Sequence, residues 1–257
     1  PHPIEDVTAR IAEERPAGVF APHVETSAGV MLPDEYIKEL ADGAHAVGGL
    51  MILDCVASGT VWIDMEALGV DVLITAPQKG WSASPCAGLV MMSQRALDVM
   101  AETSSSSFAV DLKKWHDIMK AYENGGHAYH ATMPTDALIA FRDAIDETRA
   151  LGFDTAKQRQ FELGGKVREL LAERGFKSVA ARGYEAPGVV VSYTGDPAMQ
   201  NGSKFAAKGM QIAAGVPLQC DEPEDFRTFR IGLFGLDKLR DVDATVARLQ
   251  HVVDKVL

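Results

Sequence analysis

The segments Leu50-Met51-Ile52-Leu53-Asp54 and Val70-Asp71-Val72-Leu73-Ile74 decide the fold. Each is a short, mainly apolar run, which is typical of a strand that lies in a parallel sheet and is covered on both faces. A third run occupies residues 88–92, and residues 18–21 predict a further short strand. The first half of the chain therefore contains several candidate strands of one sheet.

Two helices are predicted around these strands. Residues 4–15 favour a helix that ends at Pro16. Residues 33–47 favour another, because Pro33 suits a first turn and Gly48 with Gly49 suits an end. Strands that alternate with helices indicate an α/β fold with a mostly parallel, doubly wound sheet.

The pattern of apolar residues changes in the second half of the chain. From it we predict a small α+β domain at residues 151–257, after a large domain at residues 1–150. Its apolar pattern indicates long helices, then β-rich stretches, then an amphipathic C-terminal helix. The expected helices are 111–122, 134–151, 153–175 and 241–257, and the expected strands are 189–193, 211–217 and 228–233.

Composition excludes several classes of function. The 25 Lys and Arg against 36 Asp and Glu give a net charge of −11 with no basic cluster, which argues against nucleic-acid binding. No apolar run reaches the roughly 18 residues that a membrane span needs. The three cysteines, Cys55, Cys86 and Cys220, are too few and too scattered for a disulfide scaffold. This cysteine usage predicts a cytoplasmic protein.

An acidic residue and a lysine follow two neighbouring strands. Asp54 ends the first run, and Lys79 follows the second in Thr75-Ala76-Pro77-Gln78-Lys79-Gly80. Ligands of open α/β sheets gather at such strand ends. A lysine amine can form a Schiff base with an aldehyde cofactor, and a carboxylate can keep a pyridine nitrogen protonated. The alternative is that Asp54 and Lys79 merely pair with each other or cap adjacent loops.

The amino-acid sequence around Asp54 and Lys79 resembles that of the class V aminotransferases, which use pyridoxal 5'-phosphate (PLP). The likeness is greatest to the alanine–glyoxylate, serine–glyoxylate and serine–pyruvate aminotransferase group. Six segments carry it, in the order of the family: His23-Val24-Glu25-Thr26-Ser27-Ala28-Gly29-Val30, Leu53-Asp54-Cys55-Val56-Ala57-Ser58, Pro77-Gln78-Lys79-Gly80, Ser107-Phe108-Ala109-Val110-Asp111-Leu112-Lys113, Ala128-Tyr129-His130-Ala131-Thr132-Met133-Pro134 and Phe229-Arg230-Ile231-Gly232-Leu233-Phe234-Gly235.

The resemblance implies an aspartate aminotransferase-like PLP-dependent transferase of fold type I. Residues 1–150 would be the C-terminal part of the large PLP-binding domain, and residues 151–257 the small α+β domain. The family's glycine-rich phosphate turn and ring-stacking aromatic residue have no counterpart here. We therefore expect the chain to be incomplete at its N-terminus.

The resemblance also implies roles at the cofactor ring. Lys79 would hold PLP as a Schiff base and, once freed, move a proton between the substrate and the cofactor. Asp54 would pair with the pyridine nitrogen, and Val56 would pack against one ring face. Thr26, or Ser27 beside it, would hydrogen-bond near the ring hydroxyl.

The remaining implied roles concern the phosphate and the substrate. Gln78 would reach the cofactor phosphate, while Tyr129 and Thr132 would reach the phosphate in the neighbouring subunit of a homodimer. Arg230 would clamp the substrate carboxylate, because a guanidinium binds a carboxylate through two parallel hydrogen bonds. A role in which Arg230 only caps a strand stays open.

The resulting expectation is transamination between a small amino acid, alanine or serine, and a small 2-oxo acid, glyoxylate or pyruvate. The main alternative is a fragment that binds no cofactor and serves only folding or dimerisation. A 2-aminoethylphosphonate aminotransferase is disfavoured by the Gln78-Lys79-Gly80 segment, and a cysteine desulfurase by Ala57. A metal at His127 and His130 is disfavoured because no acid or cysteine has ligand spacing.

Overall fold

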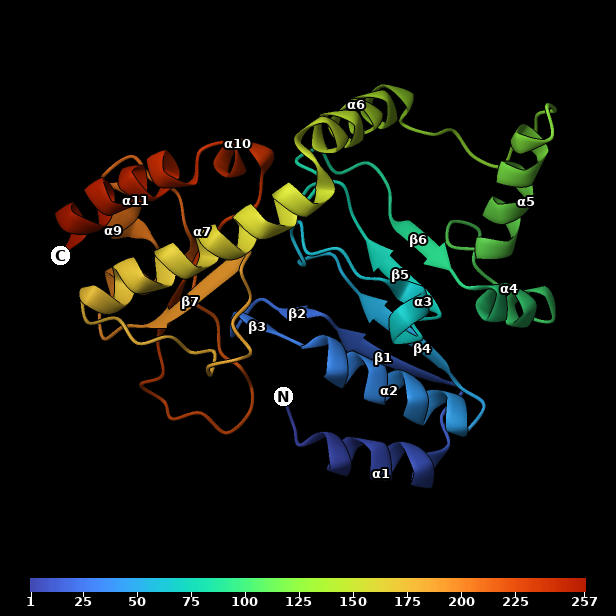
Figure 1. Ribbon diagram of the computed structural model, residues 1–257, viewed down its shortest axis with the longest axis horizontal. Helices are drawn as coiled ribbons and strands as arrows, with labels where there is room; N and C mark the ends of the chain where they lie inside the picture. Colours follow the sequence, from blue (N-terminus) through green and yellow to red (C-terminus); the bar gives the residue numbers. More distant parts are fainter.

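The computed structural model describes all residues from 1 to 257. The larger sheet has four strands. Figure 1 shows helices beside it and, at the left of the view, a second unit built on the long helix α7. The first unit contains α1 (Ile4–Glu14), β1 (Gly18–Pro22), β2 (Val24–Glu25), β3 (Val30–Met31), α2 (Asp34–Ala46), β4 (Leu50–Asp54), α3 (Met65–Leu68), β5 (Val72–Thr75), β6 (Leu89–Met92) and α4 (Gln94–Ala101). The rest contains α5 (Leu112–Glu123), α6 (Thr135–Leu151), α7 (Phe153–Glu173), β7 (Val189–Tyr193), α8 (Pro197–Gln200), α9 (Ser203–Ala206), β8 (Ala213–Ala214), β9 (Thr228–Gly232), α10 (Leu236–Leu239) and α11 (Val242–Val256).

The main sheet is mixed rather than wholly parallel. Its order is β1-β4-β5-β6, in which β1, β4 and β5 run parallel and β6 runs antiparallel to β5. Parallel neighbours need a crossover connection, usually a helix. The segment between β5 and β6 contains no helix, so the chain turns back beside β5.

A buried carboxylate delays the start of β5, which was expected at residue 70 and begins at Val72. Asp71 is 3% exposed. Its Oδ2 accepts the Met51 N–H at 2.9 Å and lies 2.7 Å from His45 Nε2, while its Oδ1 accepts the Ser93 hydroxyl at 3.0 Å. Asp71 therefore ties β4, the end of α2 and the start of α4 together.

The two faces of the sheet are covered unequally. Met51, Leu53 and Leu73 point to one face and share a buried core with Ile37 of α2. On the opposite face of β1, Phe20 is 61% exposed. This edge of the sheet therefore carries a large apolar side chain that the rest of the chain leaves uncovered.

The second unit is a small antiparallel sheet, ordered β7-β9-β8. Helix α7 packs against β7, and α11 packs against α7. Strand β8 covers only Ala213–Ala214, although residues 211–217 were expected to be extended. A Cβ at Gly215 would lie 1.8 Å from the Thr228 carbonyl oxygen, and Pro217 has no N–H to donate to a ladder. The chain leaves the sheet at this point.

The predicted break between two long helices is confirmed at Gly152, whose φ of +94° suits glycine. The two main hydrophobic clusters lie within residues 11–73 and residues 156–256. The division of the chain at 150 stays a prediction. None of the helices combines the length and the apolar character that crossing a membrane requires.

Candidate active site

Asp54 and Lys79 lie at the same edge of the sheet. Asp54 is the last residue of β4 and is paired in register with Ile74 of β5. Lys79 follows the end of β5 at Thr75. Because β4 and β5 are parallel, their carboxyl ends meet at one edge, where open α/β sheets bind ligands.

The two residues do not pair with each other, whereas the capping of an adjacent loop, the other part of the alternative, is present at Asp54. Asp54 Oδ1 accepts the Val56 N–H at 2.9 Å, and its other oxygen has no protein partner. The Lys79 amine makes neither a hydrogen bond nor an ion pair, and it lies 5.2 Å from the centroid of the Phe234 ring. Both groups are half-buried and retain bonding capacity for a ligand.

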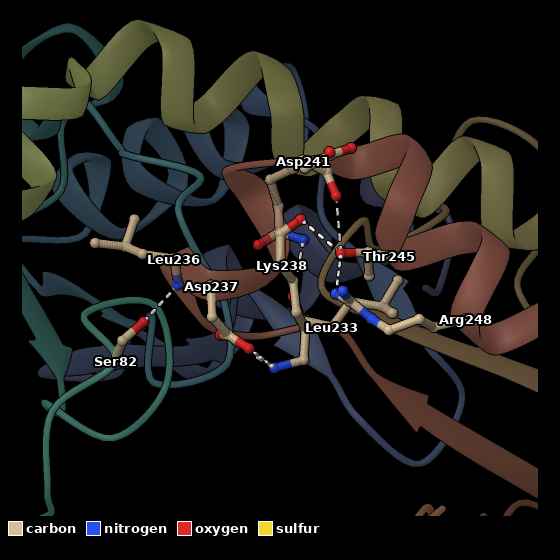
Figure 2. Close-up of polar contacts among 9 residues, drawn as sticks. Ser82, Leu233, Leu236, Asp237, Lys238, Asp241, Thr245 and Arg248 are labelled. Atoms are coloured by element: carbon tan, nitrogen blue, oxygen red, sulfur yellow. Dashed lines mark hydrogen bonds and ion pairs between the residues drawn. The ribbon is translucent and has the colours of Figure 1, made fainter.

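The backbone after Lys79 is held closely on two sides. Gly80 is buried, and a Cβ there would lie 1.9 Å from the carbonyl oxygen of Gly59. Ser82 Oγ accepts the N–H of Leu236, from the segment after β9, at 2.7 Å (Figure 2). The position of the lysine is therefore fixed by the loop after β4 and by the second unit together.

An aromatic cluster anchors the same loop. Trp81 lies 4.7 Å from Trp62 between ring centroids, and it packs edge-on against Phe141 of α6 and Phe153 of α7. The Trp62 indole N–H donates to the Phe153 carbonyl at 3.0 Å. No periodic pattern of residues predicts this cluster, because its members come from two loops and two helices.

His23 is the most deeply buried titratable group next to the site. The residue is 1% exposed, and Nδ1 lies 2.7 Å from Ser58 Oγ. Its backbone N–H donates to the Asp54 carbonyl at 2.8 Å. Burial, with a smaller contribution from the charge of Lys157, lowers the pKa of His23 to about 4. A neutral imidazole therefore braces the loop that begins at Asp54.

The structure brings Arg230 to the hairpin of Thr26 and Ser27. Arg230 Nε donates to the Ala214 carbonyl at 2.7 Å, and Nη1 reaches the Thr26 carbonyl at 3.5 Å. Arg230 thus does bridge β9 to β8, yet its Nη2 has no protein partner. Ser27 donates its N–H and its hydroxyl to Glu25 Oε1, at 2.8 and 2.6 Å.

The residues expected at the phosphate are exposed. Gln78 makes no side-chain hydrogen bond within the protein and lies beside Lys79 in sequence. Tyr129 Oη and Thr132 Oγ1 lie 3.2 Å apart, between α5 and α6. His130 Nε2 lies 2.7 Å from the Phe108 carbonyl, and no group of metal-ligating side chains forms around it.

Two hollows of the molecule are lined by residues near this region. A cavity of about 460 Å³ along β1 is lined in part by His23, Glu25 and Ser27, but not by Lys79. A smaller one of about 120 Å³ is lined in part by Trp81 and Cys55. Burial raises the pKa of the Cys55 thiol to about 12, so this cysteine is unreactive at neutral pH.

The donor set suits PLP at the ring end of the cofactor. To form a Schiff base, the aldehyde needs an amine that is not ion-paired with an acid. To stay protonated, the pyridine nitrogen needs a carboxylate with a free oxygen. Lys79 and Asp54 meet these two conditions at one sheet edge, with half-buried Val56 next to Asp54.

Comparisons with known proteins identify relatives of the chain. The profile of the family described as "Aminotransferase class-V" matches residues 3–216. A 2-aminoethylphosphonate–pyruvate transaminase of Paraburkholderia phymatum is 29% identical, over 95% of this chain and 64% of its own length. An alanine–glyoxylate aminotransferase of Oryctolagus cuniculus is 28% identical, over 99% and 66%. The crystal structure of an alanine–glyoxylate aminotransferase from Nostoc sp. superimposes with a TM-score of 0.82 at 23% identity, over 98% and 65%.

The chain thus spans about two-thirds of the length of these relatives. The structural match supports the expected fold type I architecture, and the family match does not favour an inert folding unit. Since the family profile covers most of its residues, the chain belongs to the class-V aminotransferase family.

Proposed function

We propose that the protein transfers amino groups with PLP, between a small amino acid and a small 2-oxo acid. The observation that carries the proposal is the placement of an unpaired amine, on Lys79, and an unshared carboxylate oxygen, on Asp54, at one sheet edge. Unpaired ionisable groups gathered at the ligand-binding edge of an α/β sheet mark a candidate functional site.

In this proposal Lys79 would hold the cofactor covalently through its aldehyde, and its amine would be free again once an amino acid had replaced it. When bound, PLP supplies an electron sink that makes the Cα–H bond of the substrate acidic. The released Lys79 amine takes the Cα proton and returns it at C4′ of the cofactor. Asp54 keeps the ring nitrogen protonated, Val56 packs against the ring, and Thr26 or Ser27 binds near the ring hydroxyl.

The phosphate end supports a proposed homodimer. Gln78 would contact the phosphate within the subunit, while Tyr129 and Thr132, already 3.2 Å apart, would contact the phosphate of the neighbouring one. The α5 segment stands away from the sheet at the right of Figure 1. It exposes Met119 and Tyr122, at 58% and 60%, as a surface for a second copy would.

The substrate assignment rests on Arg230 and on the relatives. The free Nη2 of Arg230 suits a carboxylate, and the rabbit and Nostoc relatives are named for alanine and glyoxylate. We therefore propose alanine or serine as donor, and glyoxylate or pyruvate as acceptor, in the cytoplasm. A second candidate donor is 2-aminoethylphosphonate, because several relatives are named for it and a guanidinium also binds phosphonate oxygens.

Reductive trapping tests the cofactor assignment. The folded chain is mixed with PLP, reduced with borohydride and mapped by peptide mass spectrometry. We expect one phosphopyridoxyl adduct, on Lys79. It should vanish in Lys79→Ala and persist in Lys208→Ala, which removes an exposed lysine. A folded native chain without an adduct on Lys79 would refute the proposal.

The donor is tested separately by protection of Lys79. A true donor displaces the lysine and so reduces its trapping. Protection by alanine or serine but not by 2-aminoethylphosphonate would support the first assignment, and the reverse pattern would select the second. The variant Arg230→Lys should weaken protection by the true donor, because lysine cannot form the bidentate contact.

A further inference from the structure

The amine of Lys79 contacts the second unit through an aromatic ring and not through a carboxylate. The amine lies 5.2 Å from the centroid of the Phe234 ring, within the range of a cation–π interaction, and no carboxylate pairs with it. Phe234 follows β9, four residues after Arg230. No hydrogen bond or ion pair within the protein competes with this contact.

The ring of Phe234 cannot easily move away from the amine. A Cβ at Gly188 would lie 2.9 Å from Phe234 Cε1, so the absence of a side chain at this glycine makes the space that the ring fills. Phe234 also packs against the buried cluster of Val24, Ala57 and Ala186. The ring is thus backed by β2, by the loop after Asp54 and by the entry to β7.

A hydrogen bond sets the lysine loop and the Phe234 segment in register. The Leu236 N–H donates to Ser82 Oγ at 2.7 Å, as Figure 2 shows. The lysine loop and the segment after β9 therefore touch at two points, Lys79 with Phe234 and Ser82 with Leu236. Together these contacts hold the amine over the ring. Such a two-point contact is more than the chance approach of a flexible lysine.

We propose that Phe234 is a positioning residue that holds the amine of Lys79 whenever it is not attached to the cofactor. This inference rests on the proposed function. When the donor displaces Lys79, the lysine takes up the proton that the donor's ammonium group loses, and the Phe234 ring face stabilises the ammonium so formed. Lys79 then loses this proton again before it takes the Cα proton. Phe234 would therefore raise the apparent affinity for the amino donor, rather than accelerate proton transfer itself.

Competitive acylation of the cofactor-free chain tests the contact. The native protein and the variants Phe234→Leu and Phe234→Tyr are treated with a trace of acetic anhydride, and acetylation of Lys79 is measured relative to that of exposed Lys208. An ammonium held by the ring reacts slowly. We expect the relative rate to rise about three- to tenfold in Phe234→Leu, which lacks the aromatic face, and to stay unchanged in Phe234→Tyr.

A second readout ties the contact to the donor. In the trapping assay, the alanine concentration that halves the Lys79 adduct should rise about three- to tenfold in Phe234→Leu, and not in Phe234→Tyr. If 2-aminoethylphosphonate proves to be the donor, it replaces alanine. A purely structural role would instead lower the thermal stability of both variants without this pattern.

The outcomes separate the two proposals. An unchanged acetylation rate in Phe234→Leu, or an equal rise in Phe234→Tyr, would overturn the role of the ring. If Phe234→Leu loses its circular dichroism signal, Phe234→Met supplies the same measurement. If the native chain forms no adduct on Lys79, the proposed function fails while the acylation result still decides the contact.

Discussion

Mild acid should destabilise the protein through His23. The residue titrates at 6.5 in an unfolded chain and at about 4 in the buried site beside Ser58. Because the pKa is lowered on folding, the stabilisation is complete above about pH 6.5. It is lost as the pH falls from there towards 4, since the unfolded chain takes up the proton first.

The magnitude follows from the two pKa values. Between pH 7 and pH 5 the linkage relation gives a fall of about 2 kcal/mol in the free energy of unfolding. The variant His23→Asn keeps a polar group that can face Ser58 but cannot be protonated in this range. It should therefore lack this part of the pH dependence, whatever its absolute stability.

Urea unfolding at pH 7 and pH 5 measures the effect. The native chain, His23→Asn and the exposed-histidine control His127→Asn are compared, and the quantity of interest is the change in free energy between the two pH values. Carboxylates that titrate in the same range contribute equally to all three proteins. The reasoning is refuted if His23→Asn shows the same pH-dependent fall as the other two.

Three further substitutions test the site. Gly80→Ala should cost about 1–3 kcal/mol in unfolding free energy and reduce the Lys79 adduct, because its Cβ would meet the Gly59 carbonyl; thermal unfolding and trapping would measure both, and an unchanged melting temperature would contradict the reasoning. Ser82→Ala should cost about 1–2 kcal/mol, because it leaves the Leu236 N–H without its acceptor; Ser82→Thr, which keeps a hydroxyl, is the control in urea unfolding. Arg230→Lys should raise the donor concentration for half-protection of Lys79 about 10–100-fold with the adduct itself retained, and equal protection would exclude a carboxylate clamp.

The sequence could predict the elements whose signals are local. The helix at Ile4–Glu14 and the strand Leu50–Asp54 were expected within one or two residues of their bounds, because periodicity and turn residues determine them. The same signals placed Asp54 and Lys79 at neighbouring strand ends. That much of the site follows from strand order alone.

What could not be predicted depends on contacts between distant segments. The antiparallel direction of β6 depends on the path of the loop after Lys79. The residue at which β5 begins depends on the hydrogen bonds that Asp71 accepts from distant segments. The depth of His23 and the approach of Phe234 to Lys79 likewise have no signature in spacing. Each involves segments that are brought together only by the folded chain.

The aromatic anchor beside Lys79 also gives the protein an intrinsic optical reporter. Of the three tryptophans, Trp62 and Trp81 contact each other in the aromatic cluster beside Lys79. The third, Trp115, lies on α5 against His130. In the variant Trp115→Phe, all indole emission would come from the pair next to the lysine. Ligand attachment at Lys79 could then be followed in real time by fluorescence alone, without substrate turnover or chemical labelling.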